Sequence, residues 1–383
     1  MSNERTNLLG MTKEELSGFA RGIGEPSYRG AQLFNWLYAR GATSFGVMTD
    51  LGKTFRSRLE EAAAIGGLAL QARRRSERDG TTKLLFALED GLRIESVLIP
   101  SAPAVRDGDA AGEEGEGRLT LCVSTQVGCP LDCAFCATGT MGFGRNLTAG
   151  EIVDQVLAGG REAGKEITNV VFMGMGEPLL NYDAVMKAAG LLTAGVGIAV
   201  RRITVSTAGR VEEIRRMADE KRRVKLAVSL HSAVDATRTR LMPINRKFGL
   251  RLLMEAVEYY YRKTKQPLTY EVIFFDGLND APADVARLIA LARRVPSKIN
   301  IIPFHAISFT HPAPFAASLA PSPRVEEIAG ELRRAHLTVM IRTSAGEDID
   351  AACGQLALSL HGRERGRGEG RNRAVATGRR AVV

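Results

Sequence analysis

The chain has 383 residues, of which 45% are hydrophobic and 25% charged, and its net charge is +9. A chain of this length and composition can bury a full core and still carry a smaller accessory module. No apolar run approaches the roughly 18–20 residues of a membrane span, and the start MSNERTNLLG lacks the apolar stretch of a secretory signal. We therefore expect a cytoplasmic protein with no membrane partner.

Residues 1–70 predict a small helical accessory domain. Thr12 and Glu15 have the spacing of a capping box, which starts a helix that continues through Phe19. A second helix is expected over Ala31–Tyr38, whose aromatic side chains suit packing between helices.

Residues 71–117 predict a β-hairpin linker followed by a loop. Two strand-like runs, Lys83–Leu88 and Leu92–Ile99, flank the turn-forming sequence Glu89-Asp90-Gly91. The acidic, Ala- and Gly-rich stretch Ser101–Gly117 is expected to be a flexible loop.

Residues 118–360 alternate between strands and helices. The expected strands are Leu119–Ser124, Asn169–Met173, Arg202–Ser206, Val224–Leu230, Thr269–Phe274 and Lys298–Ile302. Helices are expected between them, for example over Glu151–Leu157, Val211–Ala218, Arg251–Tyr261 and Asp284–Arg293. Six β–α units predict an α/β fold, a partial parallel β/α barrel with its helices outside. Functional residues should then lie at the C-terminal ends of the strands.

Residues 361–383 form a Gly- and Arg-rich tail with seven arginines against two glutamates, a net charge of +5. Such a segment cannot bury apolar area, so we expect it to be disordered. Its composition fits a solubilising extension and a phosphate-attracting RNA arm equally well.

Five cysteines are present: Cys122, Cys129, Cys133, Cys136 and Cys353. An odd number without a secretion signal argues against a disulfide framework. Three of them form the run Cys129-Pro-Leu-Asp-Cys133-Ala-Phe-Cys136, just after the first strand of the alternating region. Three thiolates can hold three irons of a cubane cluster and leave the fourth iron open. A zinc site completed by a histidine remains an alternative at this point.

The triplet, with Phe135 before its last cysteine, resembles the cluster motif of the radical S-adenosylmethionine superfamily. Five further segments look like the RlmN family of adenine-C2 methyltransferases. They are Cys122-Val-Ser-Thr-Gln-Val-Gly-Cys129, Asn169-Val-Val-Phe-Met-Gly-Met-Gly-Glu-Pro178, Ala351-Ala-Cys-Gly-Gln355, Glu95-Ser-Val-Leu-Ile-Pro100 and Ser229-Leu-His231. This resemblance, from Leu8 to Leu356, implies a 4Fe–4S cluster on Cys129, Cys133 and Cys136. It also implies RNA partners, namely 23S ribosomal RNA and transfer RNA.

The resemblance further implies a radical mechanism, because adenine C2 has no lone pair to attack an electrophilic methyl group. Cys353 would take a methyl group from one S-adenosylmethionine, and a radical from a second would activate that methyl for addition to C2. Glu95 would accept the C2 proton, and Cys122 would form a disulfide with Cys353 and release the RNA. An external electron donor such as a flavodoxin or ferredoxin is implied as well. Taken alone, Cys122 fits a small hydrophobe within a strand better, and the Cys353 motif beside it favours the catalytic role.

The positions that match the family's cofactor contacts are Gly176, Glu177, Ser206, Ser229, Leu230, His231 and His305. The serines could also be ordinary cap or turn residues. His305 stands where the family usually has Asn. An imidazole can donate one hydrogen bond, but it cannot present the donor and acceptor of one amide group.

RNA recognition is predicted less sharply. A basic stretch could contact phosphates or be a solvated helix face. It comprises Arg201, Arg202, Arg210, Arg215, Arg216, Lys221, Arg222 and Arg223. The adenine has to leave its stack to expose C2.

Two other functions remain open from sequence. One is the related C8-specific ribosomal RNA methyltransferase that confers antibiotic resistance. The other is a non-catalytic, zinc-stabilised RNA-binding protein.

Overall fold

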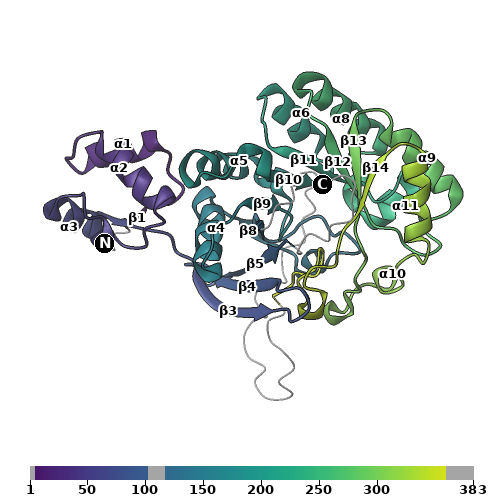
Figure 1. The fold of residues 1–383 in the computed structure, drawn as a ribbon, viewed down its shortest axis with the longest axis horizontal. Coiled ribbons are helices and arrows are strands. Elements are labelled where there is room, and N and C mark those ends of the chain that lie inside the picture. Colours follow the sequence, from purple (N-terminus) through teal and green to yellow (C-terminus); the bar gives the residue numbers. More distant parts are fainter. Residues whose placement is uncertain (1–4, 102–116, 359–383) are drawn as a thin grey trace, which may run out of the picture.

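The computed structural model describes residues 5–101 and 117–358, which form a helical module beside a β/α barrel (Figure 1). Most of the predicted acidic loop (102–116) and the predicted Arg-rich tail lie outside the described residues. Within the described part, no helix combines the length and apolarity that crossing a membrane requires.

The helical module contains three α-helices and follows the predicted capping. Its elements are β1 (Thr6–Asn7), α1 (Lys13–Gly22), α2 (Arg29–Phe34), η1 (Asn35–Ala39), η2 (Phe45–Val47), α3 (Lys53–Ala62) and β2 (Ala63–Ala64). The Thr12 hydroxyl accepts the Glu15 N–H at 3.2 Å, and the Glu15 carboxylate accepts the Thr12 N–H at 2.7 Å. The predicted second helix is therefore α2, which continues into the π turn η1.

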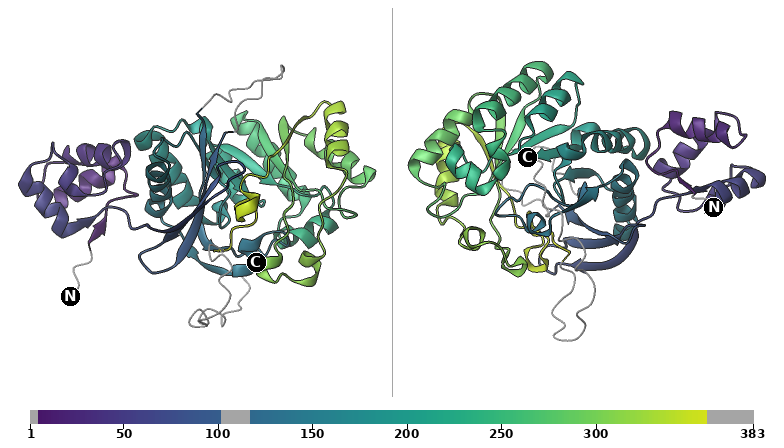
Figure 2. Two further views of the ribbon diagram at one scale, coloured as in Figure 1. Left: turned by 60° about the horizontal axis from the view of Figure 1, so that its bottom comes forward. Right: turned by 180° about the vertical axis from the view of Figure 1, so that it is seen from behind.

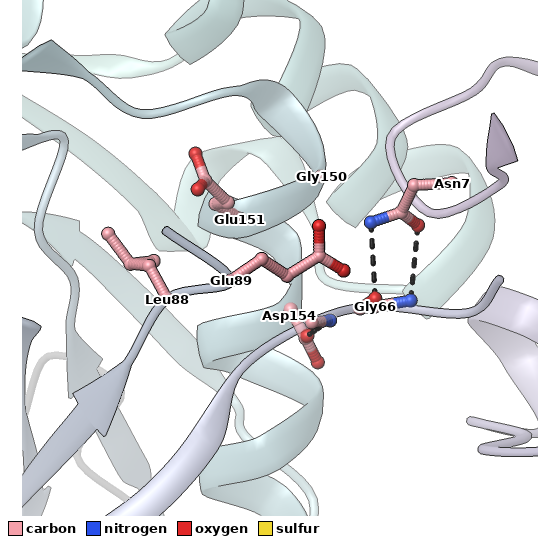
Figure 3. Close-up of a pocket in the computed structure, with 8 residues that line it drawn as sticks. Asn7, Gly66, Leu88, Glu89, Gly150, Glu151 and Asp154 are labelled. Carbon is pink, nitrogen blue, oxygen red and sulfur yellow. Dashed lines mark hydrogen bonds between the residues drawn. The ribbon is translucent and has the colours of Figure 1, made fainter. Parts of the chain in front are cut away.

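The linker that leaves the module is fixed to the barrel by polar contacts. Asn7 and Gly66 exchange two hydrogen bonds of 3.2 and 3.1 Å, which Figure 3 shows beside a small pocket. Asp154 on α4 (Ala149–Ala163) accepts the Gly67 and Leu68 amides at 3.0 and 3.1 Å. These bonds set where the chain enters the barrel.

Close glycine contacts dock the module against the barrel. A Cβ at Gly195, in η5 (Leu192–Val196), would lie 2.6 Å from the Tyr38 Cβ. A Cβ at Gly10 would lie 2.5 Å from the Gly150 backbone nitrogen. The module therefore packs against the barrel, as its place beside α4 and α5 (Tyr182–Leu191) in Figure 1 indicates.

The barrel contains the six predicted β–α units and ends with one more parallel strand. The strands are β6 (Leu119–Cys122), β9 (Asn169–Phe172), β10 (Ile203–Thr207), β11 (Lys225–Ser229), β12 (Leu268–Val272), β13 (Ser297–Ile301) and β14 (Thr338–Ile341). The helices that follow the first six strands are α4, α5, α6 (Val211–Asp219), α8 (Leu250–Thr264), α9 (Pro282–Ala292) and α11 (Val325–Arg334). Shorter helical elements lie in the connections: α7 (Asp235–Leu241), α10 (Pro314–Ala317), η3 (Ala137–Met141), η4 (Pro178–Asn181), η6 (Val200–Arg202), η7 (Pro243–Arg246), η8 (Ser308–Thr310) and η9 (Glu347–Ile349). The strands are adjacent in chain order and all parallel, so the fold is an open barrel.

The predicted hairpin extends this sheet. β3 (Ala69–Arg75), β4 (Thr82–Ala87) and β5 (Arg93–Pro100) pair antiparallel, and β5 pairs with β6. The sheet thus has ten strands, with β3 and β14 at its two edges.

Strand register shows which residues share a face of the sheet. Lys83, Val97 and Cys122 are register partners on β4, β5 and β6, so their side chains point to the same face. Glu95 lies two residues from Val97 and points there too. On β10 to β13 the same register places Ser206, Ser229, Glu271 and Asn300 on this face. We call it the inner face; the opposite face contacts α4 through the hydrogen bond from Ser96 to Gln155.

The C-terminal segment connects the two edges of the sheet. Residues 342–358 leave β14 and reach the β3–β4 hairpin, where the Gly346 amide donates to Asp79 at 2.8 Å. In Figure 2 this yellow segment lies between the blue strands and the green part of the barrel. Cys353 therefore lies across the open side of the barrel.

Candidate functional site

A short hairpin encloses the three clustered cysteines. β7 (Gln126–Gly128) and β8 (Phe143–Asn146) pair antiparallel on either side of residues 129–142, a hairpin that the sequence did not predict. The Cys129 N–H donates to the Gly142 carbonyl at 2.9 Å. A Cβ at Gly128 would overlap the Gly142 oxygen at 1.9 Å, so only glycine fits there. We call residues 129–142 the cysteine loop.

The cysteine loop is attached to the segment that carries Cys353. The Ala137 N–H donates to the Gly354 carbonyl and the Thr138 hydroxyl to the Leu356 carbonyl, each at 2.7 Å. Both acceptors lie within three residues of Cys353. These bonds bring the predicted methyl-carrying cysteine next to the predicted cluster ligands, which are more than 200 residues away in sequence.

The environment of the clustered thiols suits a positively charged metal group. Burial, together with the nearby Cys136, Glu177 and Asp132, raises the pKa of Cys129 to about 12, although the Leu131 amide opposes this. Burial also raises the pKa of Cys133, with Arg238 opposing. Thiolates here need additional positive charge, which iron provides when it binds them.

The three clustered cysteines lie within eight residues, and each can bind a different iron of one cubane cluster. Among the residues the structure describes, no three His, Cys, Asp or Glu side chains converge to hold one metal ion. A cubane cluster binds each cysteine to a different iron, so its ligands stand further apart than those of zinc.

Glu95 and Cys122 lie on the inner face, near the Cys353 segment. Cys122 is buried, and burial together with Cys353 raises the pKa of its thiol to about 12. Cys353 is exposed on its turn, yet the surrounding protein raises the pKa of its thiol. Glu271 and Cys136 add to this rise in pKa, and Arg342 opposes it. Both thiols are free in the structure, so the disulfide between them stays a prediction.

Glu95 is fully buried and forms an ion pair with Lys83. The Lys83 Nζ lies 3.2 Å from Glu95 Oε1, and both side chains are 0% exposed. Burial raises the pKa of Glu95, while Lys83 and the backbone amides of Leu358 and Ala357 oppose that rise. The carboxyl group is thus covered by the Cys353 segment.

Two predicted cofactor contacts, Gly176 and Glu177, form the turn after β9. Gly176 has φ +99°, and a Cβ there would lie 2.5 Å from the Gln126 side chain. The Glu177 carboxylate accepts the Leu179 and Ala208 amides at 3.0 and 2.7 Å, so it also fixes the turn. Burial raises its pKa to about 6, although these amides and the Thr207 hydroxyl lower it.

The other predicted contacts lie at the ends of β10 and β11. Ser206 and Ser229 are on the inner face and only partly covered, whereas Leu230 and His231 are buried. The His231 Nδ1 accepts the Ile273 amide at 3.1 Å, and its ring packs on Phe135 at 4.5 Å. Burial and Arg238 lower the pKa of His231 to about 3, so the ring is neutral and its Nε2 carries the proton.

His305, at the position where the family usually has Asn, has one free ring nitrogen. Its Nδ1 lies 3.3 Å from Glu347 Oε1, and its Nε2 is buried without a hydrogen-bond partner among the described residues. A buried polar atom without a partner fits a position that a bound molecule completes.

The sequence analysis missed three polar residues of the inner face. Glu271 is 2% exposed. Its Oε1 accepts from Asn300 at 3.0 Å, and within the part of the chain that the structure describes its Oε2 has no hydrogen-bond partner. Arg342 lies just after β14, near Glu271 and Cys353. Its positive charge opposes the rise that burial causes in the pKa of each of these two groups. A charged residue within an apolar strand, as in Leu268–Val272, is the signal that could have identified Glu271.

Three of the eight residues of the predicted basic stretch form short internal ion pairs. Arg210 pairs with Glu213, Arg216 with Asp183 and Glu220, and Arg222 with Glu220, at 2.6 to 2.7 Å. Such pairing favours a solvated helix face over a phosphate track.

Comparisons with known proteins cover both parts of the chain. The radical SAM superfamily matches residues 123–289, and the ribosomal RNA large subunit methyltransferase N-terminal domain matches residues 6–65. The chain is 44% identical to the dual-specificity RNA methyltransferase RlmN of Geobacter sulfurreducens, over 92% of each chain. It is 40% identical to that of Anaeromyxobacter dehalogenans, over 98% of this chain and 97% of the relative.

A solved structure agrees with the fold. The crystal structure of a radical SAM methyltransferase from Sphaerobacter thermophilus superposes with a TM-score of 0.81 at 40% identity, over 92% of this chain and 99% of that one. The match extends over the barrel and beyond it.

Proposed function

The chain belongs to the RlmN family of radical S-adenosylmethionine RNA methyltransferases, and from this premise we propose that it methylates C2 of adenosine in 23S ribosomal RNA and in transfer RNA. Its cofactors are a 4Fe–4S cluster and S-adenosylmethionine, which together supply a 5′-deoxyadenosyl radical. The single observation that carries the assignment of residues is the attachment of the Cys353 segment to the cysteine loop.

Each cysteine has its own role in this proposal. Cys129, Cys133 and Cys136 hold the cluster. Cys353 carries the methyl group as a thioether and presents it to the adenine ring. Cys122, on the inner face near Cys353, attacks the Cys353 sulfur and frees the methylated RNA.

The remaining predicted residues bind the cofactor or move a proton. Glu95 accepts the C2 proton. Gly176, Ser206, Ser229 and His305 line the cofactor position, and the buried Glu177, Leu230 and His231 support it. The partly covered serines and the unpartnered His305 Nε2 support this assignment.

Two partners complete the proposal. A small external electron-transfer protein, such as a flavodoxin or ferredoxin, supplies the electron, and the RNA substrates imply that the enzyme acts in the cytoplasm. Neither alternative function receives support from the comparisons, which match methyltransferases over nearly the whole chain.

The test uses anaerobically reconstituted protein with S-adenosylmethionine, a reductant and unmodified 23S RNA or tRNA. Mass spectrometry should detect 2-methyladenosine, and none with Cys353→Ala; Cys122→Ala should accumulate a covalent protein–RNA adduct. Equal iron content in both variants controls for cluster loss. Formation of 8-methyladenosine would instead show the activity of the related C8 methyltransferase. A colourless protein with stoichiometric zinc would show a non-catalytic RNA-binding protein in place of a methyltransferase.

A further inference from the structure

The buried ion pair between β4 and β5 is costly to maintain. Lys83 and Glu95 are both fully buried, and neither Glu95 oxygen has a hydrogen bond of good geometry. Removing two charges from water costs several kcal/mol per ion, and their attraction often fails to repay it. A pair of this kind therefore needs a reason other than stability.

Lys83 has a second contact, with the segment that carries Cys353. Its Nζ donates to the Asp350 carbonyl at 3.0 Å, three residues before Cys353. Asp350 has φ +53°, in the left-handed region that aspartate adopts more readily than most side-chain-bearing residues. The Lys83 ammonium thus holds the chain where it turns toward Cys353.

The same hairpin holds this segment at two more points. Asp79 accepts the Gly346 amide at 2.8 Å, and Arg74 reaches the Asp348 carbonyl at 3.4 Å. Arg74 is exposed on the edge strand, whereas Lys83 is buried and alone among the three also contacts Glu95. Arg74 therefore provides a matched control for Lys83.

Few groups act on the Glu95 carboxyl. They are Lys83 from β4 and the amides of Ala357 and Leu358 from the Cys353 segment. On the β6 side, Cys122 lies on the same face, and the Ser124 hydroxyl donates to the Glu95 backbone carbonyl at 2.6 Å. Lys83 is thus the cation that lowers the pKa of this buried carboxyl and favours its ionised form.

We propose that Lys83 is a positioning residue that ties the ionised state of Glu95 to the docked position of the Cys353 segment. The inference rests on the proposed function, in which the adduct at C2 gives its unpaired electron to a one-electron acceptor, the C2–H bond breaks with its electron pair staying in the ring, and the proton passes to the Glu95 carboxylate. One ammonium contacts both the proton acceptor and the chain that carries the methyl group. The acceptor is therefore ionised in the same arrangement that presents Cys353.

The first test compares the full-length, reconstituted enzyme with Lys83→Met and Arg74→Met. Without its cation, Glu95 should protonate at higher pH, so the acid limb of RNA release should move up by at least one pH unit. At pH values on the acid limb the release rate should then fall about tenfold, and the covalent protein–RNA adduct should persist there. Arg74→Met should leave the limb in place. A superimposable profile for Lys83→Met, or an equal shift for Arg74→Met, would overturn the proposal.

The second test measures docking without turnover, through the rate at which iodoacetamide alkylates Cys353. It compares Glu95→Gln with the double variant Lys83→Met/Glu95→Gln. The double variant contains neither charge of the pair, so it remains usable if Lys83→Met alone fails to fold. Loss of the bond to Asp350 should make alkylation several-fold faster in the double variant, and equal rates would refute the holding role. The alkylation rates can be measured even if the wild-type protein makes no methyladenosine. Failure of the proposed function and failure of this inference are therefore distinguishable.

Discussion

Arg238 offers a sharp test of how the ends of the barrel strands are held together. It is 0% exposed, and its guanidinium donates to the carbonyls of Ala208, Ser229 and Leu230 and to the side chain of Asn245, at 2.6 to 3.2 Å. These carbonyls lie at the C-terminal ends of β10 and β11. Burial lowers the pKa of Arg238 to about 10, so the side chain remains charged at neutral pH.

The cost of Arg238→Met follows from these contacts. Four buried acceptors lose their donor, and at about 1 kcal/mol each the loss is about 4 kcal/mol. Removing one partner from a buried charged network costs about 3–5 kcal/mol in other proteins, which agrees. The matched control is Arg240→Met on the same helix. Arg240 is exposed and its guanidinium lies 4.5 Å from the centre of the Phe315 ring, so its loss should stay below about 1 kcal/mol.

Urea unfolding followed by far-UV circular dichroism measures both variants. Fluorescence is unsuitable because the single tryptophan, Trp36, is in the helical module and not in the barrel. The midpoint should fall clearly for Arg238→Met and little for Arg240→Met, at an unchanged denaturant slope. A loss below about 1 kcal/mol, or equal losses for both, would refute the hydrogen-bond count.

Two further predictions concern pH and packing. In the cluster-free chain, burial raises the pKa of Glu177 to about 6, so the folded protein favours the protonated carboxyl. The contribution of Glu177 to the free energy of unfolding is therefore complete below its ordinary pKa and is lost as pH rises through 6. Glu177→Gln should remove this dependence, worth about 2 kcal/mol, and identical plots of melting temperature against pH would contradict it. Gly195→Val should destabilise by about 1–3 kcal/mol because it forces a clash with Tyr38, whereas Gly190→Ala, with open space around it, should not lower the melting temperature.

The parts of the fold that the sequence predicted rest on local signals. The six parallel strands of the β–α units have β-branched, apolar cores, and the Thr12–Glu15 capping box is complete within four residues. The cysteine triplet is likewise local, since a spacing within eight residues limits which metal groups it can hold. Such features do not depend on which distant segments they meet.

The parts that were missed depend on distant partners. β3 has the sequence ALQARRR and is exposed along most of its length, so no alternation of apolar and polar residues marks it as a strand. β14 is four residues long and only half-buried, and its single strand neighbour is β13. Lys83 looks like a surface lysine in sequence, and its burial follows only once β4, β5 and the C-terminal segment are assembled.

The position of Cys353 follows from the barrel's being open. An open sheet leaves two free edges, here β3 and β14, and unpaired edges favour unwanted association. Residues 342–358 run from one edge to the other and are fixed at the hairpin by Asp79 and Lys83 and at the cysteine loop by Ala137 and Thr138. An irregular segment fixed at both ends can hold a reactive thiol in a defined place without a helix or strand beneath it. Release of either end would free Cys353, and the end at Lys83 is the one that also carries the proton acceptor.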